Sequence, residues 1–235
     1  MDAIIEKIRN ELRLEADEKT RLSSKRFFKE TVECYGVPSS AVNRISKLNF
    51  VLVKHEDKNR IIELCTQLWQ SGMLEETFIA CHWSNAIQSR YEPDDFGIFT
   101  HWIENYVHNW ASCDTLCNHT VGDFILMYPS FIENLKQLAH SNNRWMKRAS
   151  AVSLIIPARK GYFLTEVIEI ATHLLLDADD MVQKGYGWML KAASQAHETE
   201  IFDFVMRNKA VMPRTSLRYA IEKMPANLKK EAMAK

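Results

Sequence analysis

The sequence predicts an all-α fold, and three observations favour that class. Apolar residues recur at helical spacing through most of the 235 residues. No stretch alternates apolar and polar residues between turn dipeptides, so we expect no strand. Only 7 Gly and 6 Pro are present, without a low-complexity run, which argues against both a disordered protein and a turn-rich β-sandwich.

The expected helices are separated by short, frequent breaks. Apolar stripes with helical spacing cover 61–68, 124–128 and 167–175. At 36–40 a glycine suited to a left-handed C′ position precedes a proline suited to a first helical turn. One helix should therefore end there and the next begin. The same kinds of signal place further breaks at 71–72, 92–95, 128–130, 141–143, 160–161, 177–180 and 212–213.

The breaks predict about a dozen helices, paired in units of roughly 35–40 residues, which is the repeat length of HEAT-type proteins. In such proteins antiparallel helix pairs stack into a curved solenoid, whose concave face is a natural place to hold a DNA duplex. Self-similarity between the units is weak, so the prediction depends on spacing. No linker divides the chain, and we expect one continuous domain over 1–235.

The charge distribution and the cysteine content indicate the expected binding face and cellular compartment of the protein. The formal net charge is zero, but residues 1–140 carry 15 basic and 20 acidic side chains, whereas 141–235 carry 15 and 10. This asymmetry is typical of a basic face in the C-terminal half, although a chance excess on solvated helices predicts it equally well. Five scattered cysteines favour reduced thiols and a cytoplasmic protein. Neither a signal peptide nor a membrane span is expected.

Four residues between positions 110 and 188 are costly to bury and stand in helical segments: Trp110, Asp114, Arg148 and Trp188. Trp110 and Asp114 are four residues apart, so they share a helix face and offer negative charge beside an aromatic wall. Arg148 is suited to holding a phosphate. Together, such groups can hold a phosphodiester and stabilise a positively charged sugar.

Each of these residues also has a structural explanation. Asp114 could bond within its own helix, beside a tryptophan that belongs to the core. Arg148 could form a surface ion pair of little consequence. Trp188 could fill a tight helix contact made possible by Gly185 and Gly187. Cys113, Cys117, His108 and His119 match no zinc spacing, so we expect neither a metal nor a cofactor.

Three motifs in the same order resemble the AlkD-like DNA alkylation-repair glycosylases. The first is Asn109-Trp110-x-x-x-Asp114, followed by Val121-Gly122-Asp123-Phe124 and Tyr128-Pro129; the second is Arg144-Trp145-x-x-Arg148-Ala149; the third is Gln183-Lys184-x-x-Gly187-Trp188-x-Leu190. The turn Tyr35-Gly36-Val37-Pro38 extends the similarity to nearly the whole chain. Three motifs in this order are far more specific than any one of them.

The resemblance implies a HEAT-like solenoid that removes N3- or N7-alkylated purines from duplex DNA without a deep base-flipping pocket. It further implies that Trp110 and Trp188 flank the deoxyribose, that Asp114 lies by the anomeric carbon, and that Arg148 holds the adjacent backbone. Lys147 and Lys184 are further expected DNA contacts, as is Phe27, which falls where relatives can carry tyrosine. The other backbone candidates are Arg159, Arg207, Lys209, Arg214 and Arg218.

Two departures bear on DNA affinity and lesion preference. Ala111 replaces a second aromatic residue, and Phe27 lacks a hydroxyl group. We therefore keep two alternatives to a monomeric glycosylase acting on duplex DNA. One is a catalytically silent binder of damaged or branched DNA. The other is a HEAT-type protein scaffold, which would bury Trp110 and Trp188 completely.

Overall fold

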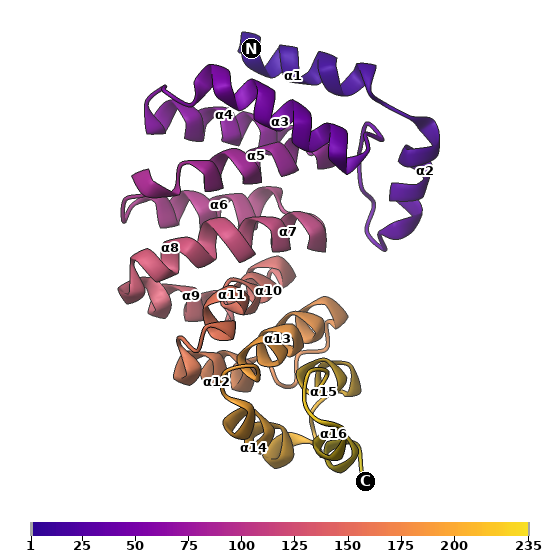
Figure 1. The fold of residues 1–235 in the computed structure, drawn as a ribbon, viewed down its shortest axis with the longest axis vertical. Coiled ribbons are helices and arrows are strands. Elements are labelled where there is room, and N and C mark those ends of the chain that lie inside the picture. Colours follow the sequence, from indigo (N-terminus) through magenta and orange to yellow (C-terminus); the bar gives the residue numbers. More distant parts are fainter. Residues whose placement is uncertain (1, 235) are drawn as a thin grey trace. The chain divides into compact units, whose positions relative to one another are not determined.

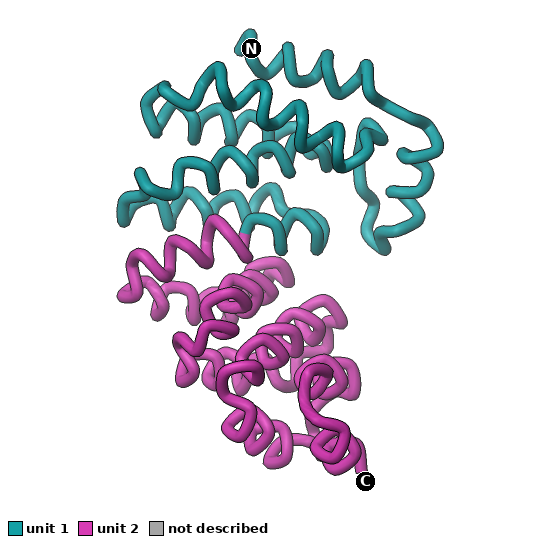
Figure 2. The backbone as a smooth tube through the Cα atoms, in the orientation of Figure 1, with its two compact units in different colours: residues 1–116 teal, residues 117–235 magenta. Residues whose placement is uncertain are grey.

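The computed structural model describes residues 2–234 and confirms the all-helical prediction (Figure 1). Within that range there is no named strand, only an isolated bridge between Glu33 and Met73. The chain divides into two compact units, Met1–Leu116 and Cys117–Lys235, coloured separately in Figure 2. That both belong to one continuous domain stays a prediction.

The first unit consists of seven α-helices over the described residues, with the pattern of stacked helix pairs expected for a helical repeat. Within it, α3, α5 and α7 pack in succession as one row, and α4 and α6 form a second row behind them. The helices are α1 (Ala3–Leu14), α2 (Glu18–Phe27), α3 (Ser39–Val53), α4 (Lys58–Gln70), α5 (Leu74–Ala86), α6 (Asp95–Tyr106) and α7 (Trp110–Leu116).

The second unit begins with a π-helical segment, Cys117–Val121. Its helices α10, α13 and α15 pack in succession, and α9 and α12 contact each other beside them. The helices are α8 (Gly122–Met127), α9 (Ile132–Leu138), α10 (Arg144–Val152), α11 (Ile155–Arg159), α12 (Leu164–His173), α13 (Asp180–Ala193), α14 (Glu198–Asn208), α15 (Arg214–Ala220) and α16 (Ala226–Met233).

Polar side chains begin several helices where the sequence places breaks. The carboxylate of Asp57 accepts from the Asn59 amide at the start of α4, and the side chains of Asn143 and Asp179 do the same at α10 and α13. Such caps satisfy amides that have no partner within the helix. Gly72 and Gly161 have φ of 69° and 87°, the left-handed region that suits glycine at helix ends.

The break at 36–40 is only partly as predicted. Pro38 does precede α3, and Gly36 does have a left-handed φ of 89°. The preceding helix, however, ends at Phe27, and the residues between it and α3 are not helical. The expectation that one helix ends at Gly36 was therefore wrong, because the 28–38 segment is held by side chains of α5 instead.

Tryptophans that the sequence assigns to apolar stripes form much of the core. Trp69, Trp83, Trp102 and Trp145 are all buried, as predicted. Trp69 and Trp102 pack with ring centroids 6.2 Å apart, which joins α4 to α6. Each large aromatic removes about 150–250 Å² from water, so these side chains contribute strongly to holding neighbouring helices together.

Candidate nucleic-acid interface and catalytic residues

Asp114 lies on α7 of the first unit, one helical turn after Trp110. The helix is capped by Asn109, whose side-chain oxygen accepts from the Ser112 amide at 2.9 Å. The Ser112 hydroxyl lies 3.1 Å from that of Thr77, which joins α7 to α5. Asp114 is therefore not the cap of its helix. Its exposed fraction is 8%, so the carboxylate lies largely out of water.

Trp110 stands in an aromatic cluster with Phe27 and Phe28. Both phenyl centroids lie 5.6 Å from the indole, and the two phenyl rings contact each other edge to face at 5.4 Å. Phe28 is buried, whereas Phe27 is 67% exposed and Trp110 is half-buried. The first unit thus brings together three residues that the sequence singles out, namely Phe27, Trp110 and Asp114.

Two buried glutamates of α5 hold the segment that carries this cluster. The Glu75 carboxylate accepts from the amides of Tyr35, Gly36 and Val37 at 2.8–3.0 Å. Glu76 accepts from Arg9 and from the Tyr35 hydroxyl at 2.7 Å. Burial and this bond to Glu76 raise the pKa of Tyr35, so the phenol stays protonated and donates. Neither glutamate was predicted to have this role from the sequence, because acids early in a helix usually signal only the helix start.

In the second unit, Arg148 of α10 lies against the first turns of α13. Its Nη1 donates to the Met181 carbonyl at 2.5 Å, and its side chain is only 4% exposed. A Cβ on Gly185 would come within 3.2 Å of the Arg148 side chain. Gly185 therefore makes room for the arginine, which explains one of the two glycines, Gly185 and Gly187, that precede Trp188. Burial and these contacts exclude the surface ion pair considered above for Arg148.

Trp188 follows Gly185 by three residues on the same helix and is half-buried. The Lys191 ammonium lies 6.0 Å from the Trp188 ring and 5.4 Å from the Tyr219 ring, while forming an ion pair with Glu222. The other glycine, Gly187, has a packing role, since a Cβ there would come 2.8 Å from that of Tyr219. Neither Trp110 nor Trp188 shows the complete burial expected for a protein scaffold.

The basic residues around Arg148 are paired with the acidic segment before α13. Lys147 contacts Asp177 at 2.5 Å, and Lys184 contacts Asp180 at 2.7 Å. Arg144 contacts Asp179 at 2.9 Å. Lys147 and Lys184 are both predicted DNA contacts, and their pairing with carboxylates could not be predicted from the sequence. Binding a phosphate at either lysine requires the carboxylate to move or be exchanged.

The remaining candidates have varied surroundings. Arg207 and Lys209 donate to backbone carbonyls of Asp203 and Glu231. All five cysteines are buried as free thiols. Over residues 2–234, no group of three or more His, Cys, Asp or Glu side chains is positioned to hold a metal ion. In the same range, no helix is both long and apolar enough to cross a membrane.

These features define an all-helical protein with stacked helices, a largely buried carboxylate beside a partly exposed aromatic cluster, and basic side chains on α10 and α13. Comparison with known proteins identifies the family. The chain belongs to the DNA alkylation repair enzyme family, whose model matches residues 8–224. This membership supports a role in the repair of alkylated DNA and, with it, DNA as a partner.

A solved structure described as a predicted DNA alkylation repair enzyme from Enterococcus faecalis has a similar fold. The TM-score is 0.80 at 12% identity, and the match covers 90% of this chain and 98% of that one. At this identity the similarity concerns the fold alone. No curated protein matches the chain.

Proposed function

We propose that this protein is a monofunctional DNA glycosylase that excises cationic N3- or N7-alkylated purines from duplex DNA. The observation that carries the proposal is the position of Asp114, largely buried and one turn from a half-buried indole. A carboxylate in such a site interacts more strongly with a developing cation than one in water does. Family membership supplies the broader setting of alkylation repair.

The chemistry of the lesion explains why its excision needs few catalytic side chains. An N7-methylguanine or N3-methyladenine base carries a positive charge while it is bonded to the sugar. When the C1′–N bond breaks, the electron pair goes to the base, which leaves neutral and needs no general acid. The positive charge moves to the sugar as an oxocarbenium-like ion, comparable to that in glycoside hydrolysis. Water then adds to C1′, and its proton passes to Asp114 or to solvent.

Each site residue has a defined part in this proposal. Asp114 stabilises the sugar cation electrostatically and orients the attacking water. The ring face of Trp110 lies beside the deoxyribose, where an aromatic contact to a cation contributes about 0.5–2 kcal/mol. Phe27 extends that aromatic surface without a hydroxyl contact. In the second unit, Trp188 offers another aromatic face to the DNA, and Arg148 acts on the DNA backbone.

Lys147 and Lys184 complete the proposed DNA contacts. To bind a phosphate, each lysine would release its aspartate, so one anionic partner would replace another. Contacts of this kind carry no sequence information, so we expect binding that is insensitive to sequence and weakens steeply with salt.

The direct test is release of free base. The protein is incubated with duplex DNA that contains a single N7-methylguanine, and the free base is separated and quantified; an undamaged duplex of the same sequence is the control. The proposal predicts release from the damaged duplex alone, with an abasic site left behind. Salt-sensitive DNA binding without any base release would instead identify a catalytically silent binder and overturn the glycosylase assignment.

A further inference from the structure

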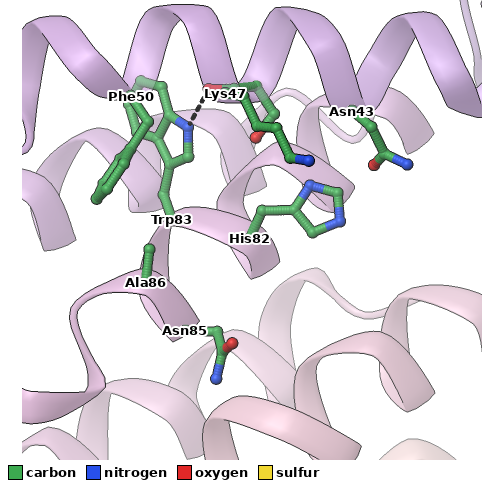
Figure 3. A pocket seen from close by; sticks show the side chains of 8 residues that line it. Asn43, Lys47, Phe50, His82, Trp83, Asn85 and Ala86 are labelled. Carbon is green, nitrogen blue, oxygen red and sulfur yellow. Dashed lines mark hydrogen bonds between the residues drawn. The ribbon is translucent and has the colours of Figure 1, made fainter.

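A pocket of about 390 Å³ lies between α3 and α5 of the first unit, apart from the residues discussed above. Its lining combines polar and aromatic side chains. Figure 3 shows Lys47 of α3 and His82 of α5 at the same end, near Asn43, with Phe50 and Trp83 at the other end. Asn85, Ser46 and Ala86 complete the wall.

One end of the pocket is aromatic. Trp83 is buried, and its indole nitrogen donates to the Ser46 carbonyl at 3.1 Å. The Phe50 ring packs against it with centroids 5.8 Å apart. These contacts link α3 to α5 and leave the half-buried Phe50 ring as the aromatic surface at this end. An aromatic ring of this kind suits the sugar or base part of a nucleotide.

Unlike several lysines of the first unit, Lys47 is not paired with a carboxylate in the described part of the chain. Lys7, Lys25 and Lys58 each lie within 4.0 Å of a carboxylate. Lys47 is exposed, and among residues 2–234 no acidic side chain lies within ion-pair distance of its ammonium. A cation without a carboxylate partner, in the more acidic half of the chain, is available to an external anion.

The pocket lies on the same row of helices as Asp114. Phe78 and Trp110 both pack against the buried cluster that includes Phe28, and His82 follows Phe78 by one turn on α5. Asp114 likewise follows Trp110 by one turn on α7. Because packed helices are spaced about 8–10 Å apart, an anion held at Lys47 lies within a few nucleotides of a sugar at Asp114.

We propose that Lys47 binds a phosphodiester of the DNA strand, with His82 beside it and the sugar resting on Phe50. Lysine is a common phosphate ligand. The inference rests on the proposed function. It adds a contact to the DNA backbone from the N-terminal part of the chain, where the charge count predicts no basic face.

The test measures binding of an undamaged fluorescent 20-base-pair duplex over a range of NaCl concentrations. The variant K47Q removes the charge, and K47R retains it. The matched control K7Q makes the same change at a lysine that is already paired with Glu11. Thermal melting of each variant establishes that the fold is intact.

We expect K47Q to weaken binding and to lower the slope of log K against log [NaCl] by about one, the loss of one phosphate contact. K47R and K7Q should keep the wild-type slope. Equal slopes for K47Q and K7Q, in a wild-type protein that binds DNA and releases base, would overturn this inference alone. A wild-type protein that neither binds DNA nor releases base would overturn the proposed function and this inference together.

Discussion

The carboxylate of Glu75 accepts a hydrogen bond from the Gly36 amide at 2.8 Å, across 39 residues of sequence. The same carboxylate also binds the amides of Tyr35 and Val37. Three amides on one buried acid fix the path of the chain between Phe28 and α3. The position of Phe27 and Phe28 against Trp110 therefore depends on a residue that lies on another helix.

Replacing Glu75 should destabilise the fold. E75A leaves three buried or part-buried amides without their acceptor, and bonds to a charged group are worth about 1.5–3 kcal/mol. We expect the free energy of unfolding in urea to fall by about 3 kcal/mol or more. E75Q keeps one oxygen acceptor and should cost less. Equal stability of E75A and the wild type would show that the segment is held by other contacts.

Gly187 and Gly97 should respond oppositely to alanine. A Cβ at position 187 would come 2.8 Å from the Tyr219 Cβ and 3.0 Å from Ser216 backbone atoms. Overpacking of this kind costs about 1–3 kcal/mol. Gly97 of α6 has no heavy atom within 4 Å of an added Cβ, so alanine there should be neutral or stabilising by about 0.5 kcal/mol. Urea unfolding of both variants checks the difference, and a neutral G187A would contradict the close packing of α13 on α15.

The Asp180–Lys184 pair should restrain DNA binding. D180N releases the lysine and removes a negative charge close to it. Because exposed pairs are worth about 0.2–1 kcal/mol, the affinity for duplex DNA should rise by up to about fivefold at low salt. D94N makes the same charge change at an exposed residue of the first unit. If D180N bound DNA no more tightly than D94N, Lys184 would have no part in binding.

The His140–His173 contact should make stability depend on pH. The two rings lie 3.7 Å apart between centroids. Burial, then repulsion from His140 and Lys147, lowers the pKa of His173. The unfolded chain, with a histidine pKa of about 6.5, therefore binds more protons than the folded one in mildly acidic solution, and stability falls as pH drops below that value.

Melting temperatures between pH 7.5 and 5.5 test this dependence. The variant H173Q removes the titrating group, so its melting temperature should fall less over that range than that of the wild type. Parallel curves for the two proteins would mean that His173 does not contribute to the acid sensitivity.

Sequence reasoning predicted the helical class well, because apolar spacing and helix breaks are local signals. It found Trp69, Trp83 and Trp102 in the core for the same reason. The structure contains sixteen α-helices over residues 2–234 rather than about a dozen, since several expected helices are interrupted. One of these interruptions is the π-helical segment Cys117–Val121, which no residue pattern predicts.

The candidate site was predictable only in part. Motif order singled out Asp114, Trp110 and Arg148 without showing what each one contacts. The hydrogen bond from Arg148 to Met181 joins positions 33 residues apart, and the ion pair of Lys147 with Asp177 joins positions 30 residues apart. Such pairings depend on how helices pack, which spacing along one helix does not reveal. The pocket at Lys47 and His82 was missed for the same reason.

Single-turnover release of N7-methylguanine by D114N tests the central claim most directly. D94N, an exposed acid with the same change, is the control, and duplex binding is measured for both. Loss of a preorganised electrostatic group typically costs about 100- to 1000-fold in rate. We expect a loss of that size for D114N, with wild-type release by D94N and DNA binding retained by both. Wild-type release by D114N would contradict it.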